Sequence, residues 1–444
     1  ALRGAHSARP RRLPVRARLR RKRGGAMSAL RRWATAWLLA VHLVSVHVVL
    51  FRLWYASGLR KTFTRREHVH LRDLQLAVEV AEGRAAAAEE AAGYQAPPPL
   101  RGAGGGRRVA LLFMLRQRLD HLEAWRGWLQ PELQRPEPRV SLYFHLADGG
   151  SGAQDAALRS LPGARRLVPR VATGWCELMA AEVALFRAAL ADDLAAELFV
   201  LLPHDAVPLA PLEAVLASLR RGAAPGAAPP APPSRICPAG VRGLEVPASC
   251  AHGVEPHWAR KLVFKHHQWL VLNRGHAERL SDPRALRSAV ALFREDYLGE
   301  PLCSDEVLPL LAITLPGGGG PPSHLAALPL FRTAAHGLAG FEAGLHEAGL
   351  AAECVTYAPW PGCGGGPAAE GKRAKSPVVG GGLPPAERDE LMRALARRGV
   401  LFGRKLGLGG GSVAGHLELI EAAAPPAGAP PRPAPRRLLP AAEP

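Results

Sequence analysis

The chain has 444 residues, a length that allows a large core and roughly two or three domains. Its formal charge is +19, but residues 1–32 hold twelve of the Lys and Arg residues and no acidic residue, so the rest of the chain carries only about +7. The basic excess is therefore an N-terminal arm, which argues against an extended nucleic-acid-binding face.

An uncharged segment follows this basic arm. Residues 33–51 are nineteen positions without Asp, Glu, Lys or Arg, and as a helix they would measure about 28 Å, close to the hydrocarbon thickness of a bilayer. Aromatic side chains gather toward its two ends, as in a membrane-interface belt: Trp33, Trp37, Trp54 and Tyr55. We predict an uncleaved signal-anchor helix, with a signal peptide cleaved near residues 56–58 as the alternative.

The charges around this helix predict its orientation. The positive-inside rule places residues 1–32 in the cytoplasm and the bulk of the chain in a lumen. If translation begins at Met27, only Arg31 and Arg32 remain on the cytoplasmic side, while five basic residues lie within residues 52–66. The charge argument then weakens or reverses.

Residues 52–106 are predicted to form a stem. Apolar residues recur there at spacings of three and four, which predicts a helix that could pair as a weak coiled coil of about two heptads. The residues on this stripe are Leu71, Leu74, Val78, Ala81 and Ala85. Proline at 97–99 and glycine at 104–106 end the helix and predict a linker.

Residues 107–422 have the texture of an α/β domain, in which short apolar runs alternate with amphipathic helices. We predict strands at 109–115, 140–146, 198–202, 268–272 and 400–402, and helices at 120–130, 177–191, from about 276, and 387–398. The strand at 198–202 runs into a loop at its carboxyl end, where open α/β sheets bind ligands. Loop insertions are predicted at 222–234, 316–323 and 362–371, and a disordered Pro/Ala-rich tail at 423–444.

Several familiar patterns are missing from the sequence. The six cysteines form no C-x-x-C, which argues against a zinc knuckle, and sequence alone does not choose among their disulfide connectivities. Residues 366–373 approach a phosphate-binding P-loop but lack its Ser or Thr and a preceding strand. No D-x-D occurs, so the usual metal handle of sugar-nucleotide enzymes is absent from the sequence.

Two adjacent carboxylates, Asp305 and Glu306, follow Cys303 and precede an apolar helical run. Adjacent residues cannot share one helix face, so one carboxylate would cap the helix while the other points elsewhere. On this stretch alone, a capping pair is the commoner explanation.

Several stretches, in chain order, together resemble the core-2/I-branching N-acetylglucosaminyltransferase family, in particular its plant and algal branch. The resemblance spans residues 107–407 and includes the K-x-x-Q-W-x-x-L-x-R-x-H-A pattern at 265–277 and the C-x-D-E segment at 303–306. The other matching stretches are residues 108–115, 140–145, 181–182, 199–202, 207–209, 355–360 and 401–406.

The chain also departs from the family pattern. Pro203-His204, with Asp205 next, replaces a Ser followed by an acid, and Lys265-His266-His267 replaces Lys-Gly-Ser. Gly403 stands where Ala is common, and Ser376-Pro377 where His-Pro is common. These differences affect the expected acceptor and sugar contacts more than the chemistry.

The resemblance implies a GT-A-like nucleotide-sugar-binding fold with a mixed central sheet, without a metal cofactor, anchored in the Golgi membrane with its catalytic domain in the lumen. It implies inverting transfer from a UDP-sugar to a hydroxyl of a glycan or glycoprotein. Glu306 is then the candidate base, with Asp305 as its helix-capping neighbour and a candidate sugar contact. The candidate contacts to UDP, whose diphosphate charge a metal would otherwise offset, are Lys405, Arg404, Lys375, Arg373, His204 and Asp205. The candidate acceptor or sugar contacts are Glu182, Gln268, Trp269, Tyr357 and Trp360.

Each of these residues also has a plainer explanation. The two Trp residues would be core residues, Arg404-Lys405 a solvated pair, and Glu182 an exposed or capping helix residue. N-acetylglucosamine is the simplest donor sugar, with xylose or glucuronic acid as alternatives. Two other classes are a Golgi scaffold that kept the fold and lost activity and, more weakly, a membrane-tethered nucleic-acid binder. The stem helix also allows weak self-association.

Overall fold

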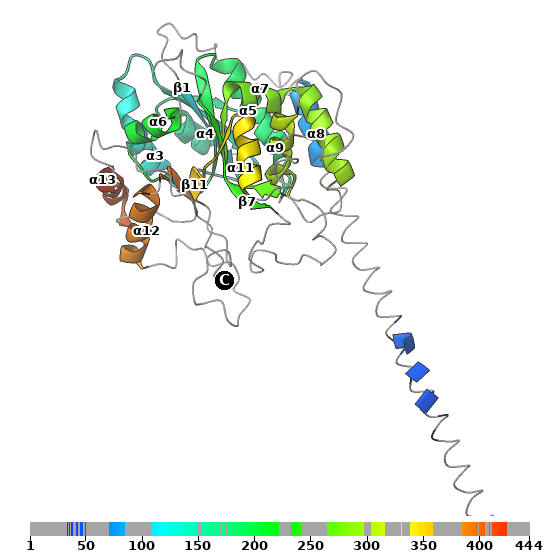
Figure 1. Cartoon of the computed structure of the whole chain (residues 1–444). Helices are drawn as coiled ribbons and strands as arrows, with labels where there is room; N and C mark the ends of the chain where they lie inside the picture. The colour runs from blue at the N-terminus through cyan, green and yellow to red at the C-terminus, as the bar shows by residue number, and fades with distance from the viewer. Residues whose placement is uncertain are drawn as a thin grey trace, which may run out of the picture. The chain divides into compact units, whose positions relative to one another are not determined.

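The computed structural model divides into two compact units, Ala1–Arg66 and Glu67–Pro444 (Figure 1). The first unit is described only at scattered positions between Trp33 and Val49, which are helical and exposed. In the described part of the chain, no helix is both long and apolar enough to cross a membrane. The second unit is described at residues 71–84, 108–148, 152–168, 170–174, 176–221, 232–241, 264–296, 303–315, 330, 338–357, 384–397, 399–404, 408 and 411–423.

A seven-stranded mixed sheet forms the centre of the second unit. In order across the sheet, its strands are β10 (Leu350–Ala352), β6 (Ser234–Ile236), β9 (Val271–Asn273), β4 (Ala196–Pro203), β1 (Arg108–Leu115), β2 (Val140–Leu146) and β3 (Ala164–Leu167). Strands β3, β2, β1 and β4 are parallel, and β9 joins β4 in the antiparallel direction. The prediction of an α/β fold with a mixed central sheet is confirmed.

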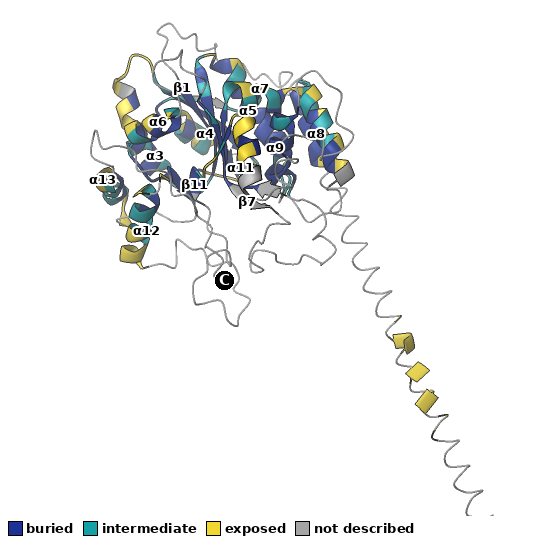
Figure 2. Ribbon diagram, viewed as in Figure 1, coloured by how far each residue is buried: buried dark blue, intermediate teal, exposed yellow. Residues whose placement is uncertain are grey.

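Every residue of β1 and β2 is buried, because helices cover both faces of the sheet (Figure 2). One face packs against α5 (Met179–Asp192), α7 (Arg274–Ser281), α8 (Pro283–Asp296), α9 (Leu308–Thr314) and α11 (Leu338–Glu347). The other packs against α3 (Leu122–Leu129), α4 (Gly152–Arg159), α6 (Leu212–Arg220) and α13 (Val413–Ala423). Alternate β1 residues serve the two faces, which is why its apolar run is continuous rather than alternating.

Two smaller sheets flank the main one. The first has the order β11 (Thr356–Tyr357), β12 (Phe402–Arg404) and β5 (Ala206–Pro208), and the second pairs β7 (Pro238–Val241) with β8 (Phe264–His266). Strand β9 begins at Val271, later than the predicted start at 268. Gln268 and Trp269 lie instead in the short connection between β8 and β9.

The helix predicted for the stem belongs to the globular unit, which corrects the predicted boundary at residue 107. Residues 71–81 are helical, and the side chains of Leu74, Ala77, Val80 and Ala81 are buried in the same core as α5 and α8. Glu82, just after the helix, pairs with Arg287 of α8. The apolar stripe was predicted to be a coiled-coil seam. Its residues Leu74, Val78 and Ala81 instead pack against the chain's own domain. The predicted linker around 97–106 and the tail after residue 423 lie outside the described residues.

Two disulfides, Cys176–Cys303 and Cys237–Cys354, each join segments more than a hundred residues apart. Cys250 and Cys363 lie outside the described residues. Each bond joins elements that meet only in the folded domain, so the spacing of the cysteines does not predict how they pair.

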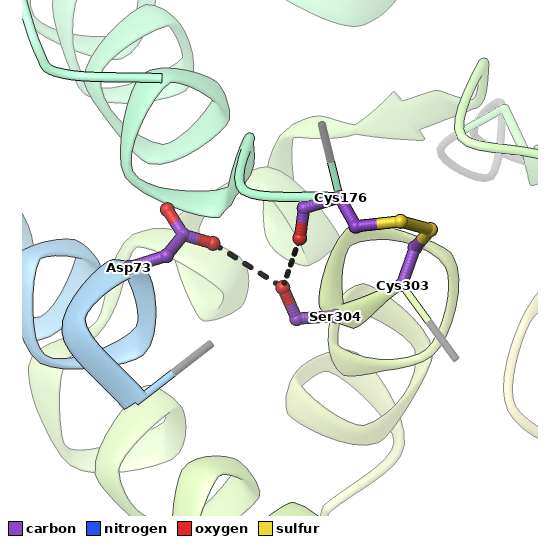
Figure 3. The surroundings of a disulfide bond; sticks show 4 residues. All are labelled: Asp73, Cys176, Cys303 and Ser304. Carbon is purple, nitrogen blue, oxygen red and sulfur yellow. Dashed lines mark hydrogen bonds between the residues drawn. A yellow bond between two sulfur atoms is a disulfide. The ribbon is translucent and has the colours of Figure 1, made fainter. Parts of the chain in front are cut away.

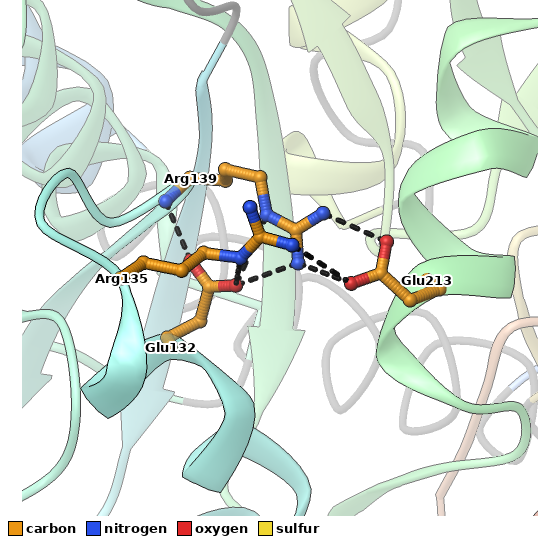
Figure 4. Close-up of polar contacts among 4 residues, drawn as sticks. All are labelled: Glu132, Arg135, Arg139 and Glu213. Carbon is orange, nitrogen blue, oxygen red and sulfur yellow. Dashed lines mark hydrogen bonds and ion pairs between the residues drawn. The ribbon is translucent and has the colours of Figure 1, made fainter.

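An ion-pair cluster holds together the amino-terminal end of the sheet (Figure 4). Glu132, in the 3-10 turn η1 (Gln130–Gln134), accepts hydrogen bonds from the backbone N–H of Arg139 at 2.6 Å and from its guanidinium at 2.7 Å. Arg139 also bonds Glu213 of α6, and Arg135 lies 3.4 Å from both carboxylates. This cluster ties η1 to α6 just before β2 begins, at the opposite end of the strands from the loops described next.

Candidate functional site

The parallel strands place a binding edge at the carboxyl ends of β1 and β4. The chain adds β2 and β3 on one side of β1 and then returns to place β4 on the other side, so the strand order reverses at β1, which is the topological switch point where open α/β sheets bind ligands. Met114 of β1 pairs in register with Pro203 of β4 at this edge. The segment 203–208, which was predicted as a loop, follows β4 at this edge, but its residues Ala206–Pro208 form strand β5.

Three of the predicted residues meet at this edge around a guanidinium group. Strand β12 pairs antiparallel with β5, and this register sets Arg404 opposite Ala206. The Nε atom of Arg404 lies 3.4 Å from Oδ1 of Asp205, and its guanidinium carbon lies 5.1 Å from the centre of the Trp269 ring. A carboxylate and an aromatic face thus hold one cation in a fixed position, which a phosphate or other anion can use.

Two further predicted residues join through a hydrogen bond. Gln268 donates from Nε2 to Oε1 of Glu182 at 3.2 Å, and its amide also lies 3.9 Å from the sulfur of Met114. Glu182 is in the first turn of α5 and is fully buried, so it is neither an exposed nor a capping residue. Burial, followed by the negative charges of Asp305 and Asp73, raises the pKa of Glu182 well above its ordinary value, and the bond from Gln268 offsets only part of this.

Asp305 and Glu306 lie in the 3-10 turn η4 (Ser304–Glu306), and both are buried. The prediction that Asp305 caps the following helix is wrong, because no side chain caps α9, whose N-cap is Val307. Pro309 in the first turn of α9 has no N–H, so fewer donors there need a partner. Asp305 instead faces the buried Glu182, close enough to raise its pKa.

A residue that the sequence did not single out supports this turn (Figure 3). Asp73, from the helix over residues 71–81, accepts hydrogen bonds from the backbone N–H groups of Met179 and Ala180 at 3.3 and 3.2 Å. Its Oδ2 atom lies 3.2 Å from the hydroxyl of Ser304, which also lies 3.3 Å from the carbonyl oxygen of Cys176. One feature of the sequence could have indicated this role of Asp73. Asp73, Ala77 and Val80 are spaced to lie on one helix face, so the acidic residue lies on the same face as apolar residues.

His204 lies beside a second histidine at this edge of the sheet. Its carbonyl oxygen accepts a hydrogen bond from the N–H of Asp120 at 3.0 Å, and His121 follows. Burial lowers the pKa of His121, while the charges of Asp120 and Asp205 partly oppose that change. The loops after β1 and β4 are therefore joined by a backbone hydrogen bond and interact electrostatically.

The remaining predicted residues are described in part or not at all. Tyr357 of β11 pairs with Gly403 of β12, the strand that also carries Arg404. Lys405, Arg373, Lys375 and Trp360 lie outside the described residues. Among the residues that are described, no group of three or more His, Cys, Asp and Glu side chains is arranged to hold a metal ion.

The fold defines an α/β protein with a mixed sheet, and the edge at β1 and β4 defines a site where a guanidinium and buried carboxylates gather. No protein-family model and no curated protein matches the sequence.

Proposed function

We propose that this chain is an inverting, metal-independent glycosyltransferase of the GT-A-like fold. It transfers a sugar, most simply N-acetylglucosamine, from a UDP-sugar to a hydroxyl of a glycan or glycoprotein. The catalytic domain works in the lumen of the Golgi, where the segment at 33–51 anchors it. One observation carries the proposal: residues from five separate stretches converge at the ligand-binding edge of the sheet.

That convergence runs through a pair of neighbours, Gln268 and Trp269. Trp269 contacts Arg404, which pairs with Asp205, and Gln268 contacts Glu182, which faces Asp305. The cationic end of this chain of contacts suits a diphosphate, and the acidic end suits a group that must lose a proton. A UDP-sugar bound between the two ends, with an acceptor hydroxyl opposite, has both requirements met.

The reaction that we propose is a single in-line displacement. The acceptor oxygen forms a bond to the anomeric carbon while the bond from that carbon to the UDP oxygen breaks. Glu306 takes the proton of the acceptor hydroxyl, and the electron pair leaves with UDP. Arg404, with Lys405 beside it in sequence, offsets the charge that develops on the diphosphate by charge-assisted hydrogen bonds.

Glu182 has a different role from the sugar contact expected of it. Its carboxyl is fully buried, and burial raises its pKa well above the ordinary value, which favours the protonated form. Because the protonated form of Glu182 cannot accept a proton, Glu182 leaves the role of base to Glu306. It also holds Gln268, and with it the neighbouring Trp269, in place.

The test is a donor screen with the detergent-solubilised full-length chain in EDTA. UDP-N-acetylglucosamine, UDP-xylose and UDP-glucuronic acid are the donors, and UDP release with glycan acceptors is the readout. Glu306→Gln should lower turnover by about 10²- to 10⁴-fold, the contribution typical of a general base. Glu278→Gln, on the exposed face of α7, is the matched control and should leave turnover unchanged.

Two results would contradict the proposal in different ways. Turnover that survives in Glu306→Gln excludes Glu306 as the base but leaves the reaction class standing. Absence of both UDP binding and UDP release in the wild-type chain refutes the reaction class itself, and the inactive Golgi scaffold then takes its place.

A further inference from the structure

We infer that Asp73 is a positioning residue, which holds the Cys303–Glu306 turn against the first turn of α5 and so sets the place of the proposed base. The inference rests on the proposed function for its effect on turnover. Its structural part, that a residue before the α/β core holds the turn, stands on contacts alone.

The first contact is with the amino-terminal end of α5. Helix α5 begins after Leu178 and has no side-chain cap of its own. The carboxyl group of Asp73 accepts from the N–H groups of Met179 and Ala180, so a residue from another helix supplies the missing cap. A buried helix end left without such a partner would be costly. Asp73 therefore fixes where α5 starts, and Glu182 lies in that same first turn.

The second contact is with η4. The Ser304 hydroxyl is fully buried and lies within hydrogen-bond distance of Asp73 Oδ2 and of the carbonyl oxygen of Cys176. Cys176 is joined to Cys303 by a disulfide, so the turn is tied to the segment before α5 by a covalent bond and by the serine. Asp305 and Glu306 directly follow Ser304. Asp73 is thus one hydrogen bond away from the proposed catalytic turn.

The surroundings of Asp73 make a carboxyl group unfavourable at this position, so its presence calls for a compensating interaction. Burial, the largest influence, and the charge of Glu177 raise the pKa of Asp73 to about 7, against the bonds from Ala180, Met179 and Ser304. Asp73 in turn raises the pKa of Glu182. The titratable groups that interact with it are thus Glu177 and Glu182, while Asp305 acts on Glu182 and Arg72 acts on Glu177. An apolar residue would fill the space at lower electrostatic cost, so the carboxyl group is kept for its hydrogen bonds.

Asp73→Ala and Ser304→Ala in the full-length chain test the inference, with Gln75→Ala as the control. Gln75 is exposed on the same helix and bonds only its helical neighbour Glu79 in the described part of the chain. Hydrogen–deuterium exchange is measured on peptides that cover residues 303–310, with a β1 peptide as the internal standard. Both test variants should speed exchange in 303–310 by about fivefold or more, the effect of losing one hydrogen bond, while β1 stays protected.

Turnover separates positioning from general destabilisation. In both test variants kcat should fall by about 10- to 100-fold, as expected when a reacting group is displaced. The Kd for UDP should stay within about twofold, because Arg404 is held by Asp205 and Trp269 and not by Asp73. The double variant should be no slower than the more damaging single one, because both changes break the same link.

Each outcome decides something. Unchanged exchange at 303–310 in both variants overturns the inference, and so does faster exchange with unchanged kcat. If Asp73→Ala does not fold, Ser304→Ala decides alone. If the wild-type chain neither binds UDP nor transfers sugar, the proposed function fails, and the exchange measurement still decides whether Asp73 holds the turn.

Discussion

The guanidinium carbon of Arg404 lies 5.1 Å from the centre of the Trp269 indole ring. The two residues are more than a hundred positions apart in sequence, and the pairing of β12 with β5 sets Arg404 opposite Ala206 at this edge of the sheet. Asp205, the residue directly before β5, pairs with the Nε atom of the same guanidinium. Cation–π contacts of this kind contribute about 0.5–2 kcal/mol, so the position of Arg404 is set before any ligand arrives.

Arg404→Ala should weaken UDP binding by about 10- to 100-fold, because a charge-assisted hydrogen bond contributes about 1.5–3 kcal/mol. Trp269→Leu should weaken it less, since the cation remains but loses its support. Calorimetric titration of UDP into the full-length chain in EDTA measures both changes. Arg393→Ala is the matched control, because Arg393 lies on α12 (Pro385–Arg397) and pairs only with Glu390 among the described residues. An unchanged Kd in Arg404→Ala would remove Arg404 from the donor site.

The elements that the sequence predicts best are those whose pattern is local. The apolar runs at 109–115 and 198–202 became β1 and β4 with slightly wider bounds, and the helix predicted at 177–191 became α5. Strand order and disulfide pairing depend on contacts between distant segments, which no local period records. The helix at 71–81 is an example: its apolar stripe could be predicted from the sequence, but the helices that cover this stripe could not.

The same division applies to the site. Asp205, Gln268, Trp269 and Arg404 were singled out from motifs, and the structure brings them together at one edge. Their partners were not readable: Asp73 completes the cap of α5 from another helix, and the burial of Glu182 follows from tertiary packing. Asp305 was misassigned as a cap because a local rule for helix starts was applied to a 3-10 turn.

His145, at the carboxyl end of β2, should make the protein less stable in acid. Its Nε2 accepts a hydrogen bond from the N–H of Val171, and burial lowers its pKa to about 4. The folded state therefore binds fewer protons than the unfolded state below about pH 6.5, so stability present above that pH is lost as the pH falls toward 4. The loss is roughly 1 kcal/mol per pH unit for one such group.

Urea unfolding of the wild type and His145→Gln between pH 4 and pH 8 isolates this contribution. The comparison is needed because His416 titrates in the same direction and Asp73 in the opposite one. The glutamine keeps an acceptor for Val171 but does not titrate in this range. The stability advantage of the wild type should therefore shrink as the pH falls, and a constant difference would show that His145 keeps an ordinary pKa.

The ion-pair cluster at the amino-terminal end of the sheet should be sensitive to one of its two carboxylates. Glu132 is almost fully buried and bonds both the backbone and the guanidinium of Arg139, whereas the Glu213 side chain is 64% exposed. Glu132→Ala leaves Arg139 partly buried without its inner partner and should cost about 3 kcal/mol. Glu213→Ala should cost about 1 kcal/mol or less, as solvent-exposed pairs do. Urea unfolding at pH 7 measures both, and equal costs would contradict the assignment.

Peptide mapping without reduction should find two particular disulfides. Trypsin should release the peptide 171–187 linked to 295–332, and the peptide 236–242 linked to 333–372, because these fragments carry the paired cysteines. Cys303→Ser should remove only the first link and lower the free energy of unfolding by about 4 kcal/mol, since the bond closes a loop of more than a hundred residues. Cys237→Ser is the matched control, which should remove only the second link and leave residues 303–310 as protected from hydrogen exchange as in the wild type. A link between Cys176 and any other cysteine would contradict the tie between α5 and the turn that carries Glu306.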